Sequence, residues 1–338
     1  MKEMAVMNRC KGVTLVELMI ALVISLMLMA GAVSIFISTK ETYKLEEDLS
    51  RIQENFRYIA DRLTRDLTLT GYTGCSLPFE DATASVHNRL SGNAGDRWIV
   101  QGTEGGSATE PDTLTISYAK PTGGADVLVG TCTNTTDPIY ISTSTSLYKA
   151  LKDNLALDSE NQVGIALLVA NCDGGDIFVA TGLYEHSDDD DDSPSSGVVG
   201  LEHEVGQSVG SLTNAEASFS VAYGHPDLSR ARVFSTEDVT YQICTDSSGE
   251  TGLCVSRGGG SLYMLMPEVT NIQVEYGLDS DEDGSADRYD VWSNAVNDSD
   301  ITGIKVTLTM VLTQDGGNDV TSDYSFIVKL RNMGLDAS

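Results

Sequence analysis

Residues 13–39 read VTLVELMIALVISLMLMAGAVSIFIST, a stretch of 27 residues with one charged side chain, Glu17, and no proline. A helix needs about 20 apolar residues to cross the hydrocarbon core of a bilayer. A cleaved secretory signal is the alternative, but its apolar stretch is shorter and ends at a small-x-small cleavage site, which is missing here. The stretch therefore predicts a membrane-spanning helix.

The residues before this span indicate its orientation. Residues 1–12, MKEMAVMNRCKG, carry three basic side chains and one acidic side chain. Short loops rich in Lys and Arg stay on the cytoplasmic side of a membrane. We therefore expect the N-terminus in the cytoplasm and everything after Lys40 on the exported side.

Glu17 is the unusual residue of the span. A carboxylate inside a transmembrane segment costs about 2.5–3.5 kcal/mol on insertion scales, and such residues are usually paired and functional. One interpretation is that Glu17 reaches the headgroups at the near end of the span. The other is that it has a positively charged partner in an assembly.

The segment Lys11-Gly12-Val13-Thr14-Leu15-Val16-Glu17-Leu18 resembles the processing site of type IV pilins and type II secretion pseudopilins. The resemblance implies that prepilin peptidase removes the leader 1–12 by cutting between Gly12 and Val13. It also implies that Val13 becomes N-methylated and that Glu17 pairs with the terminal amine of a neighbouring subunit. The family usually has Phe at the position of Val13.

The helix is expected to continue beyond the membrane, over residues 40–70. Apolar residues recur there at steps of three and four, which is the pattern of one buried helix face; they are Leu45, Leu49, Ile52, Phe56, Ile59, Leu63 and Leu67. Gly71 and Gly74 supply a stop. We predict one helix from Thr14 to Leu69, whose second half docks on a globular domain.

Residues 71–338 have the amino-acid composition and spacing of a β-rich domain. Short β-branched and aromatic runs alternate with Gly, Asp, Asn, Ser and Pro, which is typical of antiparallel sheet. The predicted strands are Thr113–Tyr118, Gly164–Ala170, Ile177–Thr181, Ala217–Ala222, Val239–Cys244, Leu262–Met266, Asn271–Gly277, Ile304–Leu312 and Tyr324–Leu330. The predicted class is α+β: a long N-terminal helix packed on a C-terminal antiparallel sheet, as in type IV pilins.

Within that family the chain most resembles PilW-type minor pilins. The resemblance rests on Ala60–Leu63, Gly71–Cys75, Asn171–Asp173 and Val269–Gly277. Residues 79–166 show little resemblance, and their role is left open.

Cys10 belongs to the leader, and five cysteines remain in the exported part. An exported domain in an oxidising compartment is expected to form disulfides. Cys244 and Cys254 flank a turn between two predicted strands, so we pair them; Cys172 pairs with Cys75 or Cys132, and the sequence does not choose. Zinc is disfavoured because the chain has no C-x-x-C pair.

The segment 279–290, DSDEDGSADRYD, has the spacing of an EF-hand-type calcium loop. Alternating oxygen donors can converge on calcium once the glycine at the sixth place allows the turn. The predicted ligands are Asp279, Asp281, Asp283, Ser285, Asp287 and Asp290. An acidic surface hairpin without an ion is the alternative. The Asp run at 188–192 lacks this alternation and indicates a solvated loop.

Motif and charge patterns disfavour catalysis and nucleic-acid binding. Gly206–Gly210 matches G-x-S-x-G, but its surroundings do not predict the strand, elbow and helix that a nucleophile needs. The chain has 50 acidic and 21 basic residues and a net charge of -29, so no basic stripe is present to neutralise phosphates.

The resemblance implies a minor pilin that takes part in type IV pilus assembly or priming near the tip, in motility, adhesion or DNA uptake. The implied partners are other minor and major pilins, prepilin peptidase, the inner-membrane assembly platform and a tip adhesin. The implied location is a single span in the inner membrane with a periplasmic domain, and then the fibre at the cell surface. A type II secretion pseudopilin is the first alternative, and a membrane-anchored periplasmic enzyme or binding protein is the second.

Overall fold

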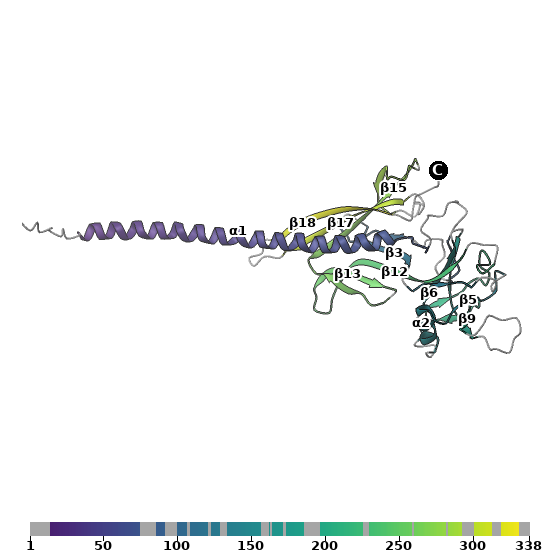
Figure 1. Ribbon diagram of the computed structural model, residues 1–338. Coiled ribbons are helices and arrows are strands. Elements are labelled where there is room, and N and C mark those ends of the chain that lie inside the picture. Colours follow the sequence, from purple (N-terminus) through teal and green to yellow (C-terminus); the bar gives the residue numbers. More distant parts are fainter. Residues whose placement is uncertain are drawn as a thin grey trace, which may run out of the picture. The chain divides into compact units, whose positions relative to one another are not determined.

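The structure is a computed structural model (Figure 1). It describes residues 14–74, 86–91, 100–106, 109–120, 123–128, 134–156, 162, 164–171, 174–185, 197–225, 230–258, 260–281, 283–292, 301–312 and 319–330. The chain divides into two compact units, Met1–Asn55 and Phe56–Ser338. Helix α1 (Leu15–Leu69) contributes to both units.

Helix α1 confirms the prediction of one uninterrupted helix. It ends where the sequence indicates, because Gly71 has a φ of 71° and its N–H donates to the carbonyl of Ser117 at 3.1 Å. A positive φ is readily adopted by glycine alone. The chain therefore leaves the helix at Gly71 and joins the β-rich part at once.

The largest sheet has nine strands and is centred on the long strand β12 (Arg232–Thr245). Its main order is β1 (Val86–Asn88), β7 (Gly174–Val179), β6 (Ala166–Asn171), β12, β13 (Thr251–Arg257) and β14 (Tyr263–Met266). Strands β3 (Thr113–Ala119) and β4 (Ala125–Asp126) also pair with β12, and β2 (Val100–Thr103) pairs with β3. All these pairs are antiparallel except β1 with β7, which differs from the purely antiparallel expectation.

A second sheet has four strands in the order β16 (Arg288–Asp290), β15 (Val269–Leu278), β17 (Ile301–Leu312) and β18 (Val320–Lys329). Strand β17 alternates as predicted: Ile304, Val306 and Leu308 are fully buried, and the residues between them are half-buried. The period-2 pattern of a strand puts alternate side chains on opposite faces. One face of this sheet therefore belongs to the core.

Two small sheets complete the β-rich part. One has three strands, β5 (Ile139–Ser142), β9 (Val198–Glu202) and β8 (Gly182–Glu185), and the other is the hairpin of β10 (Ser208–Val209) and β11 (Leu212–Thr213).

Helix α2 (Ser146–Leu155) was not predicted, although the sequence holds a signal for it. Thr145 caps it by accepting a hydrogen bond from the N–H of Tyr148 at 3.2 Å. Leu147 and Leu151, four residues apart, are buried. They belong to a core cluster formed by α2 and the strands around it: Ala125, Val127, Ile139, Ile141, Leu147, Tyr148, Leu151, Leu167, Val169, Phe178, Ala180, Val199, Leu201, Phe219, Tyr223, Ala231 and Val233.

The predicted strand Ala217–Ala222 is wrong, whereas each other predicted strand overlaps an observed one. The N–H of Phe219 donates to the carbonyl of Thr135 at 2.8 Å, and the N–H of Ser220 donates to the carboxylate of Asp176 at 2.8 Å. These N–H groups therefore bond to a loop carbonyl and a side chain, and not to the backbone of a neighbouring strand. The apolar residues of this segment are explained by a loop whose aromatic side chains enter the core.

Candidate functional site

The first turn of α1 positions Glu17. The Thr14 hydroxyl accepts a hydrogen bond from the N–H of Glu17 at 3.2 Å, and the Thr14 carbonyl accepts one from Leu18 at 3.2 Å. Thr14 is therefore the N-cap, which satisfies an N–H that has no partner within the helix. The Glu17 carboxylate lies in the first turn, where the helix dipole favours negative charge. Gly12 and Val13 lie outside the described residues.

The apolar part of α1 is exposed all round. Its large side chains, from Leu15 to Ile37, are between 50% and 75% exposed. The helix is long and apolar enough to cross a membrane, with a mean hydropathy of 2.7 over its best window and none of that window buried. So much apolar surface is unfavourable in water and stable against lipid or other apolar helices.

Polar side chains within and just after this stretch bond to their own helix. The hydroxyl of Ser25 donates to the carbonyl of Ala21 at 2.7 Å, and that of Thr39 donates to Ile35 at 2.8 Å. A satisfied hydroxyl costs little in an apolar medium. Glu17 is the one side chain between Leu15 and Ile37 that carries a formal charge.

The last turns of α1 pack on the sheets of the second unit. The ring of Phe56 stacks on Tyr324 with centroids 4.8 Å apart and meets the edge of Phe326 at 6.0 Å. Further along the same stripe, Ile59, Leu63 and Leu67 are fully buried. The predicted docking face therefore exists over residues 56–69.

Asp66 lies on this buried face and is a functional candidate that the sequence alone did not predict. One of its carboxylate oxygens accepts hydrogen bonds from the hydroxyl of Tyr241 and from the guanidinium of Arg257, each at 2.5 Å. Arg257 also donates to the hydroxyl of Tyr118 at 3.1 Å and lies 3.4 Å from Glu237. This Asp66 cluster joins the helix to β12, β13 and β3.

The contacts within the Asp66 cluster shift the pKa values of Tyr241 and Arg257. Burial, together with the negative charge of Asp66, raises the pKa of Tyr241. Burial is the largest single influence on Arg257 and lowers its pKa, but the charge of Asp66 and the contacts with Tyr118 and Tyr241 together outweigh burial, so the pKa of Arg257 is raised. The spacing could have revealed Asp66, because it falls three residues after Leu63 within the apolar stripe.

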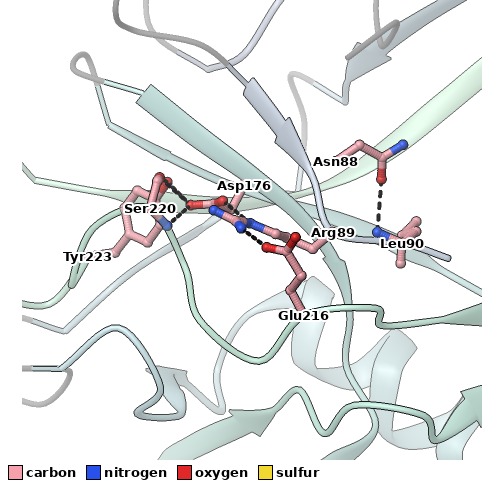
Figure 2. A network of polar contacts seen from close by, with 7 residues as sticks. All are labelled: Asn88, Arg89, Leu90, Asp176, Glu216, Ser220 and Tyr223. Carbon is pink, nitrogen blue, oxygen red and sulfur yellow. Dashed lines mark hydrogen bonds and ion pairs between the residues drawn. The ribbon is translucent and has the colours of Figure 1, made fainter. Parts of the chain in front are cut away.

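A second buried carboxylate, Asp176 on β7, organises the loop that follows β11 (Figure 2). It is fully buried, and Arg89 donates to it at 2.6 Å while also forming an ion pair with Glu216. The hydroxyls of Ser220 and Tyr223 donate to its other oxygen at 2.5 and 2.6 Å. This carboxylate accepts four hydrogen bonds from within the fold, which indicates a structural role.

The acidic loop 279–290 brings part of the predicted calcium set together. Ligand atoms of Asp279, Asp281 and Asp283 all lie within 4.8 Å of one another. Asp279 is buried and accepts bonds from the N–H groups of Asp283 and Gly284, at 3.3 and 2.7 Å. Such a trio of carboxylates has the oxygen chemistry that calcium prefers.

The other predicted ligands of this loop have partners of their own. The N–H of Ser285 donates to Asp283 at 2.8 Å, and Asp287 accepts from the N–H of Ser280 at 2.7 Å. Asp290 belongs to β16 and forms an ion pair with Arg288 at 3.8 Å. Calcium binding by the loop stays a prediction.

The neighbouring carboxylates raise the pKa of Asp281, with Asp287 the largest cause and Asp283 the next. Mutual repulsion of this kind is what a bound divalent cation would relieve.

Cys244 and Cys254 lie on paired strands in a disulfide, with Cα atoms 5.8 Å apart. This geometry is compatible with the predicted pairing. Cys75, Cys132, Cys172 and the Asp run at 188–192 lie outside the described residues.

The G-x-S-x-G match forms a hairpin. Ser208 is exposed in β10, and its hydroxyl bonds to that of Thr213 in β11 at 2.7 Å. This differs from the strand, sharp turn and helix that present a nucleophilic serine.

The family described as Prokaryotic N-terminal methylation motif matches residues 7–33. Comparison with curated proteins found no match, and neither did comparison with solved structures. The matched residues include Gly12, Val13 and Glu17 and continue into the exposed apolar part of α1. The motif supports a protein of the pilin or pseudopilin type that prepilin peptidase processes, and the apolar helix fits a membrane anchor followed by a C-terminal domain.

Proposed function

We propose that this chain is a minor pilin of the PilW type, which takes part in the assembly or priming of a type IV pilus at or near its tip. One observation carries the proposal: a prepilin-type methylation motif at residues 7–33 opens a helix whose apolar part is wholly exposed. The same helix continues without a break to residue 69, in the β-rich unit.

This arrangement suits a subunit that changes its surroundings. Before assembly, the exposed apolar side chains lie in the inner membrane and the β-rich unit lies in the periplasm. During assembly, the same side chains exchange lipid for the apolar helices of neighbouring pilins, with little change in the apolar area kept from water.

During assembly, the carboxylate of Glu17 pairs with a positive charge on a neighbouring subunit. In a bundle of apolar helices, a carboxylate is stable when it meets a positive charge. Cleavage after Gly12 creates such a charge at the amine of Val13. The Thr14 cap fixes the first turn, and therefore the position of Glu17 one turn inside the new N-terminus.

Incorporation into fibres tests the proposal. The full chain is produced in a bacterium that assembles type IV pili, and the chain is quantified in sheared fibres and in membranes. We expect Glu17→Ala to be cleaved normally but to enter fibres roughly tenfold less, because the neighbouring amine is left unpaired in an apolar environment. Glu41→Ala, which removes an exposed acid of the same helix beyond the span, is the matched control and should behave as the wild type.

Two results would contradict the proposal. One is absence of the wild-type chain from fibres, and the other is normal incorporation of Glu17→Ala.

A further inference from the structure

Strand β18 forms an edge of the four-stranded sheet, beside β17 (Figure 1). Within residues 56–330, β17 is the only described strand that pairs with it. The pairing runs over all 10 residues, from Val320 opposite Leu312 to Lys329 opposite Gly303, without a register shift. The strand contains no Pro or Gly. Its outer edge is therefore a long, regular row of backbone donors and acceptors.

Proteins usually blunt such edges, because an open edge pairs with other chains. Apart from β15, which β16 covers only over Tyr276–Leu278, the other edge strands that the structure describes have four residues or fewer; they are β1, β2, β4, β5, β8, β10, β11, β14 and β16. On the opposite side of the same sheet, Asp112 occupies part of the open edge of β15: its N–H donates to the carbonyl of Ile272 at 2.9 Å, and its carboxylate accepts from the N–H of Val274 at 2.8 Å. The contrast within one sheet singles out β18.

Strand β18 is held in place before any partner arrives. On one face, Tyr324 and Phe326 contact the ring of Phe56. On the other face, the hydroxyls of Ser325 and Thr307 are 2.8 Å apart, and Thr309 donates to Asp323 at 2.7 Å. A strand that is already ordered loses little entropy on binding.

We propose that the outer edge of β18 binds an extended segment of a different protein, which adds to the sheet as a fifth, antiparallel strand. Main-chain bonds would supply affinity, and side chains would supply specificity. The exposed face offers Asp323, Ile327 (58% exposed) and Lys329. The partner segment therefore carries a basic residue opposite Asp323, an apolar residue opposite Ile327 and an acidic residue opposite Lys329.

Net charge favours a different protein over a second copy. Two copies of this chain would each bring a charge of -29 and repel one another. A short peptide without the rest of the chain does not carry that penalty. The segment 319–330 with Ser325→Leu is a usable probe, because an antiparallel copy with Phe326 opposite Phe326 puts Lys329 opposite Asp323 at both ends and the apolar residue at position 325 opposite Ile327.

The test uses the full chain in detergent micelles and a fluorescent peptide of residues 319–330 with Ser325→Leu, and binding is followed by anisotropy. We expect saturable binding. A peptide in which Asp323 and Lys329 are exchanged places like charges opposite one another and should bind about five- to tenfold more weakly. The chain with Asp323→Lys and Lys329→Asp should prefer the exchanged peptide by a similar factor.

Absence of saturable binding, or one affinity for all four combinations, would overturn the proposal. So would a dimer of the full chain that Ile327→Lys dissociates, because the edge would then belong to a second copy.

Discussion

At the residue scale, two buried carboxylates explain how a chain this acidic keeps its core. Asp66 and Asp176 are both nearly or fully buried, and each has an arginine and a tyrosine hydroxyl as partners. Charge buried with such partners is tolerated, whereas the same charge without them is strongly unfavourable. The two carboxylates fix a helix and a loop, respectively, on the sheets.

Removal of the Asp66 carboxylate should therefore be costly. We expect Asp66→Ala to lower the free energy of unfolding by about 2–4 kcal/mol, because Arg257 keeps its charge while its side chain is only 27% exposed. Asp61→Ala, which breaks an exposed pair with Arg65, should change it by about 0.5 kcal/mol or less. Denaturant unfolding of the full chain in micelles measures both. Equal effects of the two substitutions would contradict the role given to Asp66.

The buried tyrosines should make the stability of the protein depend on pH in the alkaline range. Burial and neighbouring carboxylates raise the pKa values of Tyr223 and Tyr241 above the usual value of about 10. The unfolded chain then loses these protons while the folded chain keeps them. The free energy of unfolding should fall above pH 10 by about 1.4 kcal/mol per pH unit for each tyrosine. Tyr241→Phe should remove one such contribution.

At the scale of elements, sequence periodicity predicted the fold where one face of an element is buried. In helix α1 the apolar residues recur at steps of three and four, and in strand β17 they recur at every second residue. Both elements were correctly predicted. The segment Ala217–Ala222 has the composition of a strand but forms a loop. The carboxylate of Asp176, which lies far earlier in the chain, accepts a hydrogen bond from the backbone N–H of Ser220 in this segment. Helix α2 is too short for its period to stand out. Long-range hydrogen bonds of this kind leave no local pattern.

The acidic loop was found from its spacing, and the structure gathers three of its carboxylates. Calcium should raise the thermal midpoint of the full chain, and Asp281→Asn should abolish that rise. Without calcium, Asp281→Asn should be slightly more stable than the parent above pH 4. The raised pKa of Asp281 means that its ionisation opposes folding once the pH exceeds the ordinary carboxyl value. Identical melting with calcium and with a chelator would remove the hypothesis.

At the scale of the whole molecule, the chain separates its charge from its apolar surface. Residues 13–39 contribute only the charge of Glu17 to the net charge of -29, and the rest of that charge belongs to the remainder of the chain. The membrane span and processing motif were readable because they are local and contiguous. The Asp66 cluster and the β18 edge were not, because each depends on residues brought together by the fold.

The number of free thiols tests the predicted disulfides of residues 13–338. Removal of residues 1–12 leaves five cysteines. We expect a disulfide between Cys244 and Cys254 and a second one that includes Cys172, which leaves one free thiol. Denatured, processed protein should therefore react with one equivalent of thiol reagent. Reaction with three or more equivalents would contradict the prediction that the chain forms two disulfides in an oxidising compartment.

The mature N-terminus is the most direct test of the claim that this chain is a processed pilin-type subunit. Mass spectrometry of the protein isolated from cells that carry prepilin peptidase should find a chain that begins at Val13 and bears one methyl group on its amine. An intact N-terminus that still contains residues 1–12 would contradict that claim.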